Sequence, residues 1–297
     1  MRDILYWSGN NIGDLFNIYI GLYNDLTSFR KIEIGRSKLQ NENGVFLIGS
    51  VIQYISNNNI VMGSGLKDPK SLTTGQLSDN QFIYVRGKGT LNTNKLPNTT
   101  LLFEPGLLLR KYIKNEPERF HSFVFLPHYD QESRLKKHVT LDIDFMRFPY
   151  DEYQMILHKN SQASMKNKIM ETFEQKLSKM MKHDLIVSSS LHGLVFAVAL
   201  NKPIIWFTII GVKTEPMFKY HDFFSLFNVT AKRLDIAEEN IPNLVNELHY
   251  IVNQPKNDDD EFIYDGWLRE YIVTIDSQCY ETEMDTFQDK LREYTMG

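Results

Sequence analysis

The sequence predicts an α/β protein made of two halves, each built around a parallel β-sheet. Short, continuous apolar segments alternate with segments of helical periodicity, a pattern typical of strands that are buried on both faces. The segment at 184–207, "DLIVSSSLHGLVFAVALNKPIIWF", has the pattern of a complete strand–helix–strand unit. A charged segment that contains a proline, Arg110–Ser122, shows no burial period and separates the two series.

The first half is expected to contain four strands that end in glycine-bearing or polar turns. They lie at 3–7 ("DILYW"), 45–49 ("VFLIG"), 59–63 ("NIVMG") and 82–87 ("FIYVRG"). Apolar residues spaced by three and four predict a helix over Asp14–Tyr23. A second helix is expected to begin at Ser50, with the serine hydroxyl as its cap.

The second half is expected to restart with a strand in "FVFLPHYD", at 123–130, followed by a polar helix over Met165–Lys182. The strand–helix–strand unit comes next, and Pro203 prevents its helix from continuing. A polar amphipathic helix is predicted over Glu281–Met296. We therefore place one domain at 1–112 and a second, including this last helix, at 120–297.

The composition excludes several classes of protein. A net charge of −4 and a pI of about 6.1 provide no basic surplus for nucleic-acid binding. The single cysteine, Cys279, excludes a disulfide within the chain. The longest apolar segment, Leu194–Leu200, is too short to span a bilayer, and the first residues lack a signal-peptide pattern. We expect a cytoplasmic protein without a transmembrane segment, and peripheral association with the inner face of the membrane stays open.

The segment "VSSSLHG", at 187–193, is the strongest candidate for a functional site. It places hydroxyl groups between the end of a strand and the start of a helix, where unpaired N–H groups favour an anion. Ser189, Ser190 and the N–H groups at Leu191 are therefore expected to bind phosphate or carboxylate. His192 lies in the first turn of the helix, where an imidazole could transfer a proton near neutral pH.

Two other strand ends carry polar side chains. Arg86 follows a strand in "VRGKGT", and its planar guanidinium suits a carboxylate or a phosphate. His128 follows another strand in "PHYD". Each motif also has a purely structural interpretation: a serine cap beside a packed histidine, an arginine paired with an acid, and a solvated turn. The histidines show no HxH or HExxH spacing, so no metal site is expected.

The order of these motifs resembles that of the polysaccharide pyruvyltransferase family. The matching segments are "YWSGNNIGDLFNIYI", "FLIGSVIQYISNNNIVMGSGL", "FIYVRGKGT", "PHYD" and "DLIVSSSLHGLVFAVALNKPIIWF". They cover the chain from Tyr6 to about Phe207. Two positions depart from the family pattern. Ser190 stands where many relatives have arginine, which leaves less positive charge for an anion, and "FEPGLLL" stands where many carry "GDP".

The resemblance implies a GT-B-like fold, in which two Rossmann-like domains with parallel sheets face each other across a cleft. It implies transfer of a pyruvyl group from phosphoenolpyruvate to two hydroxyls of a sugar, as a cyclic ketal, on a cell-surface glycan or its precursor. Phosphoenolpyruvate and a glycan acceptor, free or lipid-linked, are the expected partners. Phosphoenolpyruvate is a substrate here, and no cofactor is expected.

The site residues follow from this reaction. With the phosphate on the serine-rich turn, Arg86 is the first choice for the second anion and Lys213 the alternative. His192 is the first choice for proton transfer, with Asp14 and His128 as second choices. Asn11 and Asp14 are expected to face the donor or the acceptor, although Asp14 has a purely structural interpretation as a helix cap.

Two other functions stay open at this point. The same fold would serve a glycosyltransferase that uses a nucleotide-sugar donor. The chain contains neither GxGxxG nor GxxxxGK[ST], the common nucleotide-phosphate motifs. A glycan-binding relative without activity is the third interpretation. It is supported by the absence of arginine at position 190.

Overall fold

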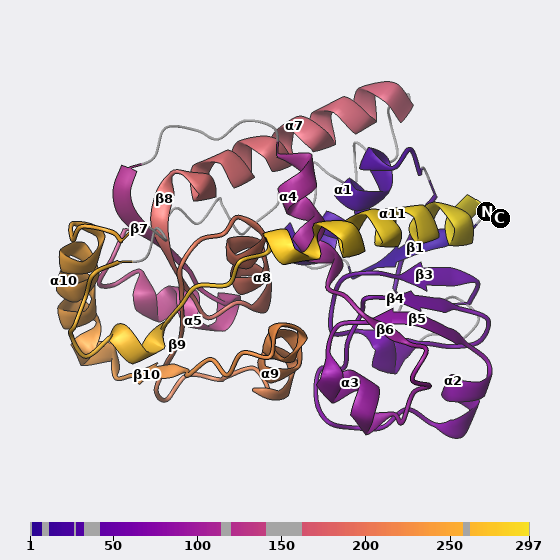
Figure 1. Ribbon diagram of the computed structural model, residues 1–297, viewed down its shortest axis with the longest axis horizontal. Helices are drawn as coiled ribbons and strands as arrows, with labels where there is room; N and C mark the ends of the chain where they lie inside the picture. Colours follow the sequence, from indigo (N-terminus) through magenta and orange to yellow (C-terminus); the bar gives the residue numbers. More distant parts are fainter. Residues whose placement is uncertain are drawn as a thin grey trace.

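The computed structural model of this chain contains two β-sheets that are joined by helices (Figure 1). The structure describes residues 2–7, 12–26, 28–32, 42–113, 120–140, 162–257 and 262–296. The first sheet comes from the first half of the chain and the second sheet from the second half. The predicted α/β fold with two Rossmann-like sheets is therefore confirmed.

The first sheet has six strands in the order β2-β1-β3-β4-β5-β6, all parallel. The strands are β1 (Asp3–Tyr6), β2 (Phe29–Lys31), β3 (Gly44–Phe46), β4 (Ile60–Met62), β5 (Gln81–Val85) and β6 (Leu101–Leu102). Most of their residues are buried, as expected for strands covered on both faces. Because the strands are parallel, all of their carboxyl ends lie at one edge of the sheet.

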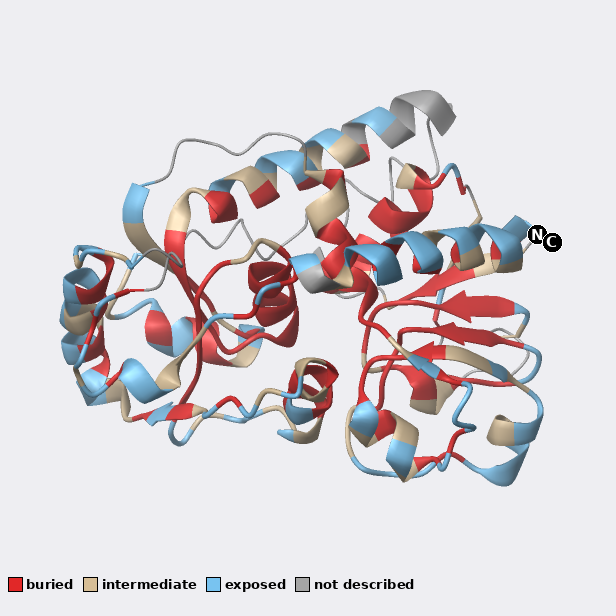
Figure 2. Ribbon diagram, viewed as in Figure 1, coloured by how far each residue is buried: buried red, intermediate tan, exposed pale blue. Residues whose placement is uncertain are grey.

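The second sheet has a parallel series in the order β10-β9-β8-β7, and β11 pairs antiparallel with the start of β9. The strands are β7 (Phe120–Leu126), β8 (His183–Ser188), β9 (Ile204–Ile209), β10 (Leu234–Ile236) and β11 (Ile272–Val273). Helix α8 (Leu191–Ala199) joins β8 to β9, and all nine of its residues are buried. The predicted strand–helix–strand unit is present, and Figure 2 shows its helix in red, the colour of buried residues.

The remaining helices connect and cover these strands. They are α1 (Ile12–Tyr23), α2 (Thr74–Ser78), α3 (Lys88–Thr93), α4 (Leu109–Tyr112), α5 (Tyr129–Leu135), α7 (Gln162–Met181), α9 (Phe218–Phe224), α10 (Ile241–Val252) and α11 (Glu281–Met296). The helix expected to begin at Ser50 is instead a single 3₁₀ turn, Ile52–Tyr54. The Ser50 hydroxyl accepts a hydrogen bond from Arg86, and β-branched Val51 and Ile52 disfavour an α-helix.

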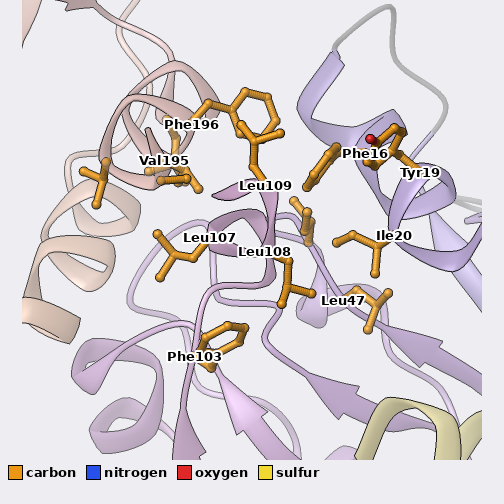
Figure 3. Close-up of a cluster of buried hydrophobic side chains, with 14 of the residues drawn as sticks. Phe16, Tyr19, Ile20, Leu47, Phe103, Leu107, Leu108, Leu109, Val195 and Phe196 are labelled. Carbon is orange, nitrogen blue, oxygen red and sulfur yellow. The ribbon is translucent and has the colours of Figure 1, made fainter. Parts of the chain in front are cut away.

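The two halves share one continuous hydrophobic core (Figure 3). Leu107, Leu108 and Leu109, in the segment that leads from a 3₁₀ turn into α4, lie between α1 and α8 and are all fully buried. Phe16 of α1 packs against Phe196 of α8, with ring centroids 5.1 Å apart. The "GLLL" segment therefore serves as apolar packing between the halves.

Helix α11 packs against the first sheet, although it follows the whole of the second in the chain (Figure 1). The ring of Phe287 lies 5.1 Å from that of Tyr84 and 4.7 Å from that of Phe103. The N–H of Arg2 donates to the carbonyl of Thr295, which holds the two ends of the described chain together. The division into domains at 1–112 and 120–297 stays a prediction, and α11 makes its aromatic contacts with the first half.

No helix in the described ranges is both long and apolar enough to cross a membrane.

Candidate active site

A pocket of about 210 Å³ lies where the carboxyl ends of strands from both sheets meet. The first half contributes Trp7, Asp14, Ser50, Val51, Gln53, Tyr54 and Lys67, and the second half contributes His128, Tyr129, Ser190, Leu191, His192, Glu215 and Lys219. These residues follow β1, β3, β4, β7, β8 and β9 in the chain. In open parallel sheets, this edge is where ligands bind.

Five of the residues predicted for the site line this pocket: Asp14, His128, Ser190, Leu191 and His192. Ser189 is next to it in the chain and is buried. Arg86 and Lys213 are absent from the lining, and Asn11 lies outside the described residues. The sequence therefore located the pocket, and the structure distributes the predicted anion-binding residues differently.

The three serines at the end of β8 have different roles. Ser188 donates from its hydroxyl to the Leu126 carbonyl over 2.8 Å and accepts from the Ser190 N–H over 3.1 Å. The hydroxyl of Ser189 accepts from the His128 N–H over 2.8 Å, so it fixes the neighbouring loop. Ser190 precedes α8, and its side chain makes no capping hydrogen bond there. It is the serine that remains for a ligand beside the first-turn N–H groups.

His192 is the most distinctive side chain in the pocket. It is only 8% exposed, and within the described part of the chain its Nε2 has no hydrogen-bond partner. Burial lowers the pKa of His192 to about 3, and the positive charges of Lys219 and Arg86 act in the same direction. The imidazole is therefore neutral at physiological pH. A neutral ring with an unpaired nitrogen can accept a proton or a hydrogen bond from a ligand.

Gly13 explains how His192 fits beside α1. A Cβ atom at Gly13 would lie 1.9 Å from Cγ and 2.1 Å from Nδ1 of His192, well inside contact distance. The glycine of "NNIGD" therefore lets helix α1 approach the imidazole closely. Any larger residue at position 13 has to displace either the ring or the helix.

Gly13→Ala is expected to lower turnover by roughly 100-fold, because a misplacement of about 1 Å can cost that much. The measurement is kcat of the purified variant, together with the imidazole NMR signals of His192. Gly75→Ala is the matched control, since a Cβ atom there meets nothing within 4 Å. Wild-type kcat in Gly13→Ala would show that the position of His192 is not critical.

Asp14 lies in the first turn of α1, as the third residue of the helix, and so it is not the helix cap. Burial raises the pKa of Asp14 to about 7, and the charge of Lys219 opposes that rise. The side chain of Asn17 fixes this turn by donating to the carbonyls of Asp14, over 2.7 Å, and Ile48. With this pKa, Asp14 can either donate or accept a proton near neutral pH.

Two lysines converge on Glu215 at the side of the pocket. Nζ of Lys219 lies 2.8 Å from the Glu215 carboxylate, and Nζ of Lys67 lies 3.2 Å from it. Burial alone would raise the pKa of Glu215, but the lysines outweigh it and lower the pKa to about 2. Lys219 is itself 8% exposed. Both ammonium groups at this side of the pocket are therefore paired with the same carboxylate.

One nitrogen of His128 and one oxygen each of Asp130 and Glu215 lie within 4.8 Å of one another. Such a set could surround a metal ion. The Glu215 carboxylate is already paired with Lys67 and Lys219, so a cation bound there would have to displace two ammonium groups from it. The expectation of no metal site stays a prediction.

Arg86 is fully buried and pairs with Asp222 of α9 rather than lining the pocket. Its Nε lies 3.0 Å from the Asp222 carboxylate, Nη1 donates to the Ser50 hydroxyl and Nη2 to the Leu66 carbonyl. Asp222 also accepts from the N–H and the hydroxyl of Thr90. The guanidinium therefore has partners on all three nitrogens, and it connects the two halves of the chain. Lys213 is exposed outside the pocket.

Sequence reasoning missed the two lysines and three aromatic residues of the pocket. Lys67 follows the second Gly-Ser turn. Lys219 is the second residue of α9, the short helix that follows the loop containing Lys213. The position of Lys67 after a strand could have predicted that it lies at the pocket. Trp7 and Tyr54 stack on each other at the pocket, and Tyr129 lies beside His128.

Comparison with known proteins gives one family. A family model described as polysaccharide pyruvyl transferase matches residues 13–209. An uncharacterised protein of Acanthamoeba polyphaga mimivirus is 28% identical over 196 residues, which are 61% of this chain and 59% of that protein. An uncharacterised protein of Klebsiella pneumoniae, known from a crystal structure, aligns with 80% of this chain and 93% of its own, at 17% identity and a TM-score of 0.42.

Proposed function

This chain belongs to the polysaccharide pyruvyl transferase family, and we propose that it forms a cyclic pyruvate ketal on a saccharide, with phosphoenolpyruvate as donor and release of phosphate. The observation that carries this proposal is the pocket itself. Two lysines and the N-terminal end of a buried helix converge there with a neutral imidazole whose Nε2 has no hydrogen-bond partner among the described residues. The cationic groups suit a small anionic donor, and the imidazole suits proton transfer between this donor and a second substrate.

The donor would bind by its negative charges. Ser190 and the first-turn N–H groups at Leu191 would hold one anionic group, where the helix contributes about half a positive charge. Lys219 and Lys67, which both lie beside Glu215, would hold the other. A pocket of about 210 Å³ is smaller than the roughly 300–1,000 Å³ of pockets for drug-sized ligands. It suits a three-carbon phosphate.

The reaction requires two hydroxyl groups to add to C2 of the donor while its methylene carbon, C3, gains a proton. One hydroxyl proton balances the proton that C3 gains, and the other leaves with the phosphate. In our proposal neutral His192 accepts a proton from the attacking hydroxyl while the donor is bound, because the donor's negative charges would raise the pKa of the ring, and protonated Asp14 donates to C3. His128 lies at the pocket as well, and burial lowers its pKa, which favours a neutral ring there.

The test is a side-by-side comparison of donors. Purified protein is incubated with a glycan pool and phosphoenolpyruvate, or with UDP-, GDP- or CMP-sugars, and released phosphate and nucleotide are measured. Phosphate release, with a glycan mass gain of one pyruvate less one water, supports the proposal. Nucleotide release would identify a glycosyltransferase instead. Glycan binding without release of either product would indicate a relative without activity.

Asp14 gives a pH prediction. Turnover is expected to fall as pH rises through about 7, because the proposed proton donor is then ionised. The folded state binds this proton more tightly than the unfolded state, whose carboxyl titrates near 3.8. The contribution of protonated Asp14 to the stability of the folded state is therefore fully present below about pH 3.8, and it is lost as the pH rises to about 7.

Asp14→Asn removes this titration, so its stability relative to the wild type should be higher at pH 8 than at pH 5. Urea unfolding at the two pH values measures the difference. Asp289→Asn is the control, since its side chain is 81% exposed. If Asp14→Asn keeps the same stability relative to the wild type at both pH values, then Asp14 does not titrate in this range.

A further inference from the structure

The residues that line the pocket fall into a buried base and an exposed rim. Ser190, Leu191, His192 and Lys219 are each at most 8% exposed. Tyr129 is 64% exposed, and Trp7 and Tyr54 are partly exposed. The anion-binding helix end, His192 and Lys219 thus lie at the base, and the aromatic side chains lie nearer to solvent together with Lys67, whose side chain is 44% exposed. Nothing in the proposed donor site uses these aromatic residues.

Trp7 and Tyr54 form a fixed aromatic pair. Their ring centroids are 5.8 Å apart, and their planes differ by 21°. Both rings pack against the small hydrophobic core behind the first sheet, which includes Val51 and Ile52. The 3₁₀ turn holds Tyr54 through its N–H, which donates to the Val51 carbonyl over 2.9 Å. Packing against this core and the backbone hydrogen bond therefore fix the two rings in place, so they form a preformed surface.

We propose that the Trp7–Tyr54 pair is the subsite for one pyranose ring of the acceptor saccharide. The C–H groups on a sugar face are weakly positive and apolar, and they complement the negative face of an indole or phenol ring. Gln53, next to Tyr54 in the chain, also lines the pocket; its Nε2 donates to the Ser50 carbonyl over 2.8 Å, and its Oε1 has no hydrogen-bond partner among the described residues. An amide beside aromatic rings suits the hydroxyls of a neutral sugar, whereas Lys219 and the helix N-terminus at the base suit the anionic donor.

The size of the pocket agrees with this division. About 210 Å³ leaves no room for a donor and a whole oligosaccharide together. One sugar ring on the aromatic pair would place its hydroxyls toward His192, and the rest of the glycan would extend outward past Tyr129. This inference rests on the proposed function only in identifying the saccharide as the acceptor, because saccharide binding itself does not require catalysis.

Fluorescence tests the subsite without any turnover. The chain has three tryptophans. Trp206 is 2% exposed and Trp267 is 51% exposed, so in a Trp267→Phe background Trp7 is the solvent-accessible reporter among the three. Methyl glycosides of glucose, galactose, mannose and N-acetylmannosamine serve as probes. We expect a saturable change in emission with at least one of them, and its loss when Trp7→Phe is added. No saturable change with any glycoside would overturn the proposal.

Kinetics provides the second measurement. Trp7→Leu is expected to raise the acceptor KM roughly tenfold with little change in the phosphoenolpyruvate KM, and Trp7→Phe should restore part of the loss. Trp267→Leu is the matched control. Turnover with an unchanged acceptor KM in Trp7→Leu would overturn the subsite and leave pyruvyl transfer intact. Saccharide-dependent emission without ketal formation would have the opposite meaning: the subsite stands and the proposed reaction fails.

Discussion

His192→Ala is expected to reduce kcat by about 10²–10⁴-fold, which is the usual contribution of a well-placed proton-transfer group. The wild-type ring is 8% exposed, and its Nε2 has no partner within the described chain, so it is available to a hydroxyl of the bound acceptor. Because the pKa of His192 is about 3, the ring is neutral over the whole working range. The loss in kcat should therefore be nearly the same from pH 6 to pH 8.

A matched substitution separates this effect from a loss of folding. His121 lies on β7 with its side chain 81% exposed and outside the pocket, so His121→Ala should retain the wild-type kcat. Thermal unfolding of both variants would show whether the fold is retained. A folded His192→Ala protein with near wild-type kcat would contradict the role of the imidazole, and proton transfer would then fall to Asp14 or His128.

Asp222→Ala is expected to lower the free energy of unfolding by about 3–5 kcal/mol, the cost of leaving a buried charge without its partner. Arg86 and Asp222 are both fully buried at a distance of 3.0 Å, and Asp222 also accepts two hydrogen bonds from Thr90. Denaturant unfolding measures the change. Since α9 also carries Lys219, the phosphoenolpyruvate KM should rise in the same variant.

The controls for this prediction are an exposed pair and a double substitution. Lys232→Met breaks the ion pair with Glu270, in which both side chains are more than half exposed, and should leave the free energy of unfolding almost unchanged. Arg86→Met combined with Asp222→Leu removes both charges and should be less destabilised than Asp222→Ala alone. If Asp222→Ala costs no more than Lys232→Met, then the buried pair contributes little to stability.

The sequence predicted the sheets well because their strands are continuous apolar segments. In the unit that contains β8, α8 and β9, burial, the helix period and Pro203 all indicate the same boundaries. Five predicted site residues reach the pocket for a related reason. Parallel strands bring their carboxyl ends to one edge, so a polar residue after a strand is at the right edge without any knowledge of the contacts.

The distribution of positive charge could not be predicted in the same way. Whether Arg86 faces a ligand or an acid depends on Asp222, which lies 136 residues further along the chain. Lys213 and Lys219 belong to the same connection after β9, and only the start of α9 decides which of them points to the pocket. Local patterns carry no information about such pairings.

The position of helix α11 against the first sheet has a consequence for the biogenesis of the protein. The ribosome completes β1–β6 long before it reaches Glu281–Met296, so a nascent chain has Tyr84 and Phe103 without the covering ring of Phe287. During that interval the sheet exposes an apolar surface that is prone to aggregation and that chaperones can bind. Maturation of the amino-terminal half therefore has to wait for the carboxyl-terminal helix.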